Sequence, residues 1–256
     1  MITVSLVGGQ SPPLVQIVVS QAPNGEAWTL TGSSDDFTWQ VPGGAGVGAG
    51  GQVSLADNRA PGNRPVIYTF KSPSKTEVSA PITVPIDGDF ALSTLDGGLS
   101  LTVGLQAGSL DVKTAVQQEL FVVPGRPRPV VRYAATSDVT GTLSLLVPIS
   151  ATGLLRKIFA PGAPVLWRFG ADSFDLPPVA VFAFGNTASS AYPTVGLRFW
   201  EVPYVLVDDP FLDQVLGAFS WELFDGKWAG KTWAQFDAFM QGRTWNQFDT
   251  FDWSTL

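Results

Sequence analysis

The chain has 256 residues, of which 45% are apolar and only 14% are charged, and its net charge is −7. Soluble proteins average roughly 25% charged residues, so this composition favours a protein that hides much of its surface against other subunits. Cysteine and histidine are absent, which excludes zinc sites built on them, disulfides, thiol nucleophiles and Ser-His-Asp triads. The acidic balance argues against a nucleic-acid partner, which would call for a basic stripe.

Strands dominate the expected secondary structure, because apolar and polar residues alternate with period two along several segments. The alternating segments are 66–70, 82–86, 99–106 and 143–149. Two further runs, 14–19 and 179–184, are apolar at most positions and predict strands covered on both faces. Abundant glycine and proline (27 and 20 residues) supply tight turns between them. The fold class predicted is mainly β, with two antiparallel sandwich-like domains and a short helical, tryptophan-rich tail.

Only two segments before the tail have helical character. Residues 154–159 fit an amphipathic helix of about two turns, and residues 211–216 could form another short one. Prolines 124, 127 and 129 indicate a stiff extended linker, because proline disfavours helix and lacks a ladder donor. We therefore expect an immunoglobulin-like domain at 1–123, a second β-rich domain with one short helix at 126–210, and the tail at 211–256.

No cofactor, metal or catalytic residue is expected, and the chain is predicted not to be an enzyme. The glycine-rich run 44–49 fits a dinucleotide pattern formally, but a strand-like segment follows it where a helix is required, which favours a flexible loop. The acidic pairs 35–36 and 208–209 are the tightest carboxylate pairs. Adjacent side chains on a strand point to opposite faces, so these pairs favour solvated turns, with a loosely held divalent cation as the alternative.

The sequence predicts neither a signal peptide nor a membrane span. The first basic residue is Arg59, whereas a signal peptide begins with a positively charged stretch, and no apolar run approaches the ~20 residues that a span needs. We expect a soluble protein made in a cytoplasm, without membrane insertion.

The end of the chain carries three copies of Trp-x-x-Phe-Asp spaced 12 residues apart, beginning at Trp221, Trp233 and Trp245. Thr232 and Thr244 stand three residues before a glutamine, which is the pattern of a helix capping box. The tail therefore predicts short helices, one of them carrying Trp233, Phe236 and Met240 on one face. Helices this short are unstable in water by themselves.

Something must cover the aromatic residues of this tail. An internal core, docking on another chain and carbohydrate stacking are three interpretations, and the helical spacing favours buried packing over open sugar platforms. The candidate protein-interaction residues are Trp221, Phe224, Trp228, Trp233, Phe236, Trp245, Phe248 and Trp253. Trp233, Phe236, Trp245 and Phe248 are the expected anchors. Asp225, Asp237 and Asp249 are expected at the wet rim or bonded to neighbouring amides.

Several segments resemble minor tail proteins of long-tailed actinobacteriophages. In the first half these are Pro13–Val19, Val41–Gly44, Gln52–Pro61 and Val66–Phe70, and later Phe199–Tyr204, Val207–Pro210 and the Thr-Trp repeats. In that family an Asp, an Ala-Pro and a Tyr-Thr strand recur in an immunoglobulin- or fibronectin-like sandwich. Tyr68 follows a Pro-Gly-Asn turn, where sandwiches often place a corner tyrosine, so its hydroxyl is predicted to bond within the first domain.

The resemblance implies a structural virion protein of the tail tip or baseplate, assembled in the host cytoplasm. Its expected partners are other phage tail proteins and copies of itself in a ring or trimer. The alternative is a receptor- or glycan-binding module of the virion that attaches to the host cell wall. For that alternative, Trp28, Trp39 and exposed loops are the candidates.

Overall fold

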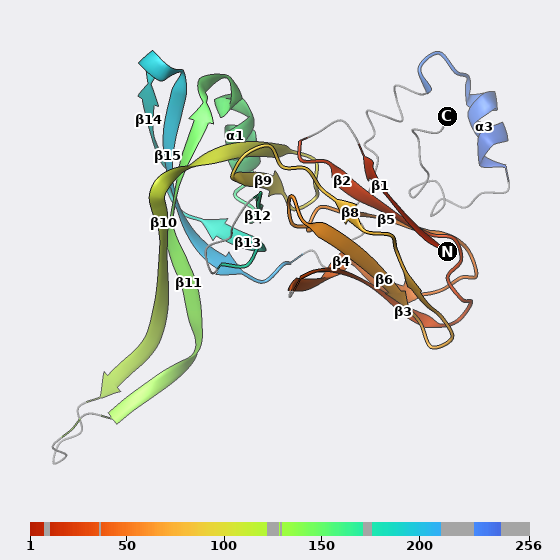
Figure 1. The fold of residues 1–256 in the computed structure, drawn as a ribbon, viewed down its shortest axis with the longest axis horizontal. Coiled ribbons are helices and arrows are strands. Elements are labelled where there is room, and N and C mark those ends of the chain that lie inside the picture. The colour runs from red at the N-terminus through yellow and green to blue at the C-terminus, as the bar shows by residue number, and fades with distance from the viewer. Residues whose placement is uncertain are drawn as a thin grey trace. The chain divides into compact units, whose positions relative to one another are not determined.

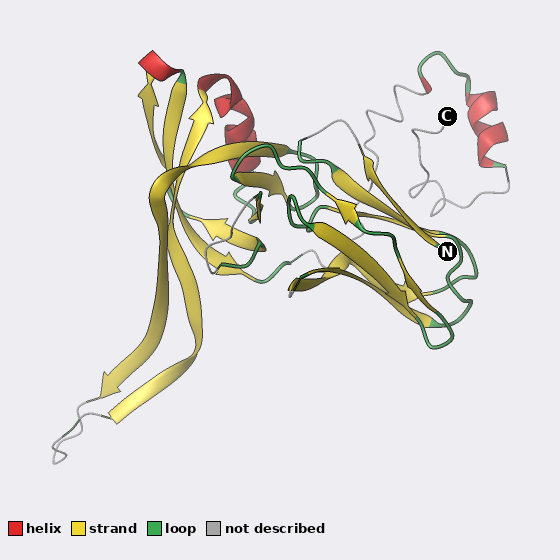
Figure 2. Cartoon of the chain, in the orientation of Figure 1, coloured by secondary structure: helices red, strands yellow, loops and turns green. Residues whose placement is uncertain are grey.

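Antiparallel β-strands make up most of the structure, as the sequence predicted (Figures 1 and 2). The computed structural model describes residues 1–7, 11–35, 37–121, 128, 130–170, 176–210 and 228–241. Two compact units share the chain. Unit 1 comprises residues 1–102, 166–180 and 209–256, and unit 2 comprises residues 103–165 and 181–208. Each unit is therefore built from segments that are separated in the sequence.

The two units do not follow the predicted boundaries. The prolines at 124–129 lie between β10 (Ser100–Phe121) and β11 (Val130–Pro148), which pair antiparallel from Gly104↔Leu146 to Phe121↔Val130. This stretch therefore connects two paired strands of one unit instead of two domains. The proline spacing carries no information on whether the flanking strands pair with each other.

Unit 1 contains a β-sandwich. Its first sheet has the order β1-β2-β5, with β1 at Ile2–Val7, β2 at Leu14–Val19 and β5 at Val53–Asp57. Its second sheet has the order β4-β3-β6-β7, with β8 paired to β6. These strands are β3 (Ala27–Ser34), β4 (Phe37–Val47), β6 (Pro65–Lys71), β7 (Thr76–Val78) and β8 (Ile82–Thr83). Ile17 and Leu55 from the first sheet share one apolar core with Leu30 and Phe70 from the second.

The glycine-rich run 44–49 is largely strand, so the prediction of a flexible loop was wrong. Strand β4 continues through Val47 and pairs with β3 at Trp28↔Gly46 and Ala27↔Val47. A Cβ on Gly46 would lie 3.1 Å from Cζ2 of Trp28, and one on Gly48 would lie 2.0 Å from the carbonyl oxygen of Pro23. At Gly48 the Pro23 backbone leaves no room for a side chain, and at Gly46 the Trp28 ring would have to shift by a few tenths of an ångström to admit one.

A second part of unit 1 is aromatic. Strands β9 (Phe90–Thr94) and β12 (Val165–Phe169) are neighbours in a sheet. Phe90, Trp167 and Phe169 pack edge to face with ring centroids 5.1–5.9 Å apart. The turn residue Asn63 is tied to this region, because its side-chain amide donates to the carbonyl oxygens of Ile86 (2.9 Å) and Gly170 (2.8 Å).

Unit 2 is a sheet accompanied by one helix. Strand β15 (Leu197–Val207) pairs with β11, with β13 (Val179–Phe184) and with β14 (Ala188–Tyr192). Helix α1 (Thr152–Phe159) confirms the predicted amphipathic helix and is preceded by a short 3₁₀ turn, Ile149–Ala151. A second 3₁₀ turn, Pro193–Val195, precedes β15. Leu155 and Ile158 of α1 are buried, and the Phe159 and Phe184 rings lie 4.6 Å apart.

Strands β10 and β11 continue beyond the third strand of their sheet. Pairing of β11 with β15 runs from Pro148 to Thr140, whereas its pairing with β10 continues to Phe121↔Val130. The outer half of this hairpin is thus a two-stranded ribbon within the part of unit 2 that the structure describes, and Figure 1 shows it leaving the sheet.

In the described ranges, no helix is both long enough and apolar enough to cross a membrane.

Candidate functional site

The predicted tail helix is present as α3 (Trp233–Met240). Thr232 caps it: its side chain accepts from the Gln235 backbone N–H, and the Gln235 side chain accepts from the Thr232 N–H at 2.8 Å. This reciprocal arrangement satisfies amide groups that a helix start otherwise leaves unpaired, and it confirms the first predicted capping box. The second, at Thr244, lies outside the described residues.

Trp228 supplies the small internal core of this segment. Its ring packs edge to face on Phe236 and Phe239, with centroids 5.4 and 5.5 Å apart. The Lys231 ammonium lies over the same indole at 4.5 Å, within cation–π range. Gly230, at φ +78°, lets the chain turn between Trp228 and the helix.

Trp233 is on the open side of the same helix. Its side chain is 81% exposed, although its ring touches the edge of Phe236 at 5.7 Å. None of the eight residues of α3 is buried. The helix therefore presents an indole to solvent while Trp228 serves its internal packing.

Of the predicted interaction residues, the structure describes Trp228, Trp233 and Phe236 and brings them together. The others, Trp221, Phe224, Trp245, Phe248 and Trp253, lie outside the described residues. The contact of Phe239 with Trp228 was missed, because Phe239 does not share the predicted face of Trp233, Phe236 and Met240. Trp228 precedes the helix, so helical spacing alone could not assign its packing partners.

Unit 1 contains a second feature, a buried polar network centred on Asp57, at the end of β5. One oxygen of its carboxylate, Oδ2, accepts from Trp39 Nε1 and from Tyr68 Oη, both at 2.9 Å. The other, Oδ1, accepts from the Arg59 backbone N–H at 2.7 Å. The hydroxyl of Tyr68 is thus bonded within the sandwich, which confirms the prediction for this residue.

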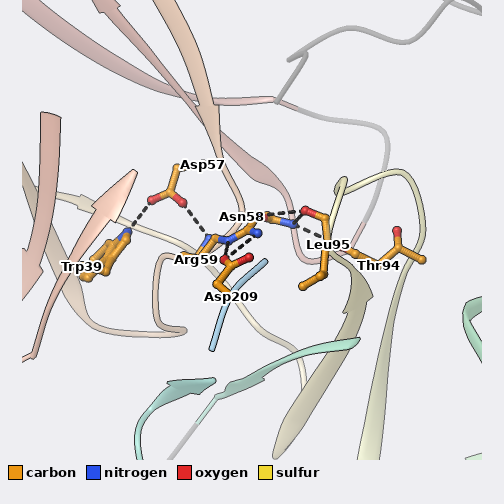
Figure 3. A network of polar contacts seen from close by, with 7 residues as sticks. All are labelled: Trp39, Asp57, Asn58, Arg59, Thr94, Leu95 and Asp209. Carbon is orange, nitrogen blue, oxygen red and sulfur yellow. Dashed lines mark hydrogen bonds and ion pairs between the residues drawn. The ribbon is translucent and has the colours of Figure 1, made fainter. Parts of the chain in front are cut away.

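Arg59 extends the network to distant parts of unit 1 (Figure 3). Its Nε donates to Oδ2 of Asp209 at 2.9 Å, and its Nη2 lies 2.8 Å from the same oxygen. Its Nη1 donates to the carbonyl oxygen of Leu95 at 2.9 Å and to the side-chain oxygen of Asn58. The Asn58 amide in turn donates to the carbonyl oxygens of Thr94 and Leu95.

Arg168, on β12, lies in the same electrostatic environment. It is 1% exposed, and its Nε and Nη1 have no hydrogen-bond partner among the described residues. Burial lowers its pKa to about 10, while the charge of Asp57 acts in the opposite direction. At neutral pH the guanidinium is therefore still charged. Burial also raises the pKa of Asp57, against the opposing effect of its bonds to Arg59, Trp39 and Tyr68.

The carboxylate pairs behave differently from each other. Asp35 is exposed in a left-handed turn (φ 48°), as expected of a solvated turn residue, and Asp36 lies outside the described residues. The solvated-turn prediction was wrong for Asp209, whose side chain is 11% exposed and ion-paired with Arg59. Its partner lies 150 residues away in the sequence, so local pattern could not reveal it. Asp208 is exposed.

The chemistry of the network is structural. Asp57 is 0% exposed and its oxygens are occupied by three donors, so it is not placed to exchange protons with a substrate. Within the described ranges, no three acidic residues cluster as a metal site would require. The sequence signal for Arg168 is a basic residue inside the otherwise apolar run Val165–Phe169.

The tryptophans considered for sugar stacking are not open platforms. Trp28 is 8% exposed and stacks on Phe70 with centroids 5.7 Å apart, inside the core of the sandwich. Trp39 is half-buried between Phe37 (5.3 Å) and Tyr68 (6.2 Å), and its N–H is bound to Asp57. Trp28 is therefore not available to stack on a glycan, contrary to the interpretation that named it as a candidate.

No protein-family model and no curated protein matches this chain.

Proposed function

We propose that this protein is a structural minor tail protein of a phage virion, which contributes to the tail tip or baseplate through protein–protein contacts. The resemblance of its sequence to actinobacteriophage minor tail proteins supports the viral assignment. The mainly β architecture is compatible with it. The observation that carries the assembly role is the exposed indole of Trp233 on α3.

The properties of α3 fit a helix that docks on a partner better than they fit an isolated helix. An eight-residue helix is marginal in water even with a good cap, and none of its residues is buried. Covering a tryptophan removes up to ~200 Å² from water and stabilises a complex by a few kcal/mol. Because Trp228 already provides the internal packing, Trp233 is free to anchor on another chain.

The outer ribbon of β10 and β11 is a second surface suited to assembly. Two-stranded hairpins are marginally stable alone, and unpaired strand edges are templates for pairing with another chain. Phe121, at the end of this ribbon, is 42% exposed. We propose neighbouring tail proteins and further copies of this chain, in a ring or trimer, as the partners, in a virion assembled in the host cytoplasm.

The glycan- or receptor-binding alternative has less support. Of its two named tryptophans, Trp28 is in the core and Trp39 is bound to Asp57. An open aromatic platform would need an exposed ring face, and among the described tryptophans Trp233 provides one, on a helix suited to protein docking.

The test compares Trp233→Ala with Tyr192→Ala in particles produced by complementation. Tyr192 is 51% exposed on β14 and controls for loss of an exposed aromatic ring. Trp233→Ala should leave the melting temperature of the isolated protein unchanged and reduce its amount in purified particles by at least about tenfold, as expected for an anchor residue. Tyr192→Ala should be incorporated normally.

Three results would contradict the proposal. Normal incorporation of the Trp233 variant would show that this indole is not an anchor. A lower melting temperature of its isolated monomer would assign Trp233 to an internal core. Absence of the wild-type protein from purified virions, by mass spectrometry, would reject the virion assignment itself.

A further inference from the structure

Three separate segments of the chain build unit 1, and each contributes a charged residue to one buried network. Asp57 and Arg59 come from the first segment, Arg168 from the second and Asp209 from the third. The third segment begins at Asp209, immediately after the chain leaves unit 2. The network is therefore the place where the last segment is tied to the first.

The side chain of Arg59 is held in place by contacts other than its ion pair with Asp209. Its side chain is 4% exposed, its backbone N–H is fixed by Asp57, and its Nη1 is bound to the carbonyl oxygen of Leu95. Two nitrogens of the guanidinium, Nε and Nη2, then converge on one oxygen of Asp209. Removing the carboxylate partner of a buried guanidinium strongly destabilises a protein, because the remaining charge is left buried without a partner.

The pair differs from an ordinary surface ion pair. Exposed pairs contribute little, since water screens them and two flexible side chains must be ordered. Here the side chains are 4% and 11% exposed, and Arg59 is already ordered by its other bonds. The bonds of Arg59 to Leu95 and Asn58 reduce the side-chain entropy that its pairing with Asp209 costs.

We propose that the Arg59–Asp209 pair is a clasp that fastens the start of the C-terminal segment to unit 1, so that unit 1 completes its packing only when residue 209 is seated. Through the clasp, the C-terminal segment that carries the Trp repeats begins at a fixed position on unit 1. It also makes the folding of the N-terminal sandwich depend on a residue 150 positions later. This role is independent of the proposed virion function.

The experiment is hydrogen exchange, read by mass spectrometry, on the full chain carrying Asp209→Asn or Asp208→Asn. Asp208 is the adjacent, exposed carboxylate and serves as the matched control. Asp209→Asn should accelerate exchange around Arg59 and around Leu95 by about tenfold, because a hydrogen bond to a charged group is lost there. Peptides from β15 in unit 2 should be unchanged. Asp208→Asn should behave as the wild type does.

Asp209→Glu, which keeps the charge, provides the second comparison. If Asp209→Asn does not fold while Asp209→Glu and Asp208→Asn do, the clasp is supported. Equal exchange in the Asp209→Asn and Asp208→Asn proteins would overturn the proposal. So would an acceleration confined to residues next to 209, without any change around Arg59 and Leu95, since that is local fraying.

Discussion

The hydroxyl of Tyr68 donates a hydrogen bond to Oδ2 of Asp57 at 2.9 Å, and both side chains are 0% exposed. Asp57 lies on the first sheet of the sandwich, whereas Tyr68 and Trp39, its other side-chain donor, lie on the second. One carboxylate thus connects the two sheets through their common interior. A buried charge with its donors in place is costly to disturb, because removing a donor leaves the charge poorly solvated.

Replacing Tyr68 with phenylalanine should lower the free energy of unfolding by about 1.5–3 kcal/mol, since the bond lost is to a charged acceptor. Urea denaturation followed by tryptophan fluorescence measures this change. Tyr192→Phe is the control: Tyr192 is 51% exposed, so its stability should stay within about 0.5 kcal/mol of the wild type. Equal midpoints for Tyr68→Phe and the wild type would show that the buried hydroxyl contributes nothing.

The hydrogen bonds of Glu26 predict that the stability of unit 1 depends on pH. Its Oε2 accepts from the Ser74 hydroxyl (2.7 Å), the Ser74 N–H (3.0 Å) and the Ser72 hydroxyl (2.8 Å). These bonds, with the Ser74 hydroxyl first, lower the pKa of Glu26 below its ordinary 4.5. A lowered pKa in the folded state means that the stabilisation is present above pH 4.5 and is lost as the pH falls through the folded-state pKa.

The stability difference between wild type and Glu26→Gln should therefore shrink as the pH falls below 4.5. An NMR titration of the Glu26 carboxyl checks the direction of the shift. Ser74→Ala should raise this pKa toward 4.5 more than Ser72→Ala does, because the Ser74 hydroxyl bond lowers the pKa most, while the Ser74 N–H bond is kept in both variants. A Glu26 pKa that does not change in either variant would refute the assignment.

Gly48 and Gly51, three residues apart, should respond differently to substitution by alanine. A Cβ at Gly48 would lie 2.0 Å from the carbonyl oxygen of Pro23, whereas one at Gly51 meets nothing within 4 Å. Gly48→Ala should cost about 1–3 kcal/mol, because the backbone at Pro23 must move. Gly51→Ala should be neutral, or stabilise slightly by restricting the unfolded chain. Thermal unfolding of both variants decides this, and similar melting temperatures would contradict the packing role of Gly48.

The sequence predicted the features that depend on local pattern. Period-two alternation identified strands such as β6 and β11, apolar spacing identified α1, and Thr232 with Gln235 identified the start of α3. The placement of Tyr68 was also predictable, because a turn followed by an alternating strand favours a corner tyrosine.

Features that depend on distant contacts were not predictable in the same way. A glycine that gives the backbone conformational freedom and a glycine that leaves space for a neighbouring side chain look identical in a sequence. Only the position of Trp28 against Gly46 in the structure distinguishes them. Likewise, Asp209 resembles any aspartate in a turn until Arg59 is placed beside it. The boundaries of the two units were not predictable for a related reason. The proline-rich stretch is flanked by strands whose pairing is a long-range property.

The interleaving of the two units has a consequence for cleavage and for recombination. The chain passes between units at 102/103, 165/166, 180/181 and 208/209. Cutting the backbone at any one of these junctions leaves at least one unit divided between the two fragments. No single protease site can therefore release unit 1 and unit 2 as separate whole pieces, and no single genetic crossover can exchange one of them intact. Exchange of unit 2 would require the replacement of two segments, 103–165 and 181–208, in the same event.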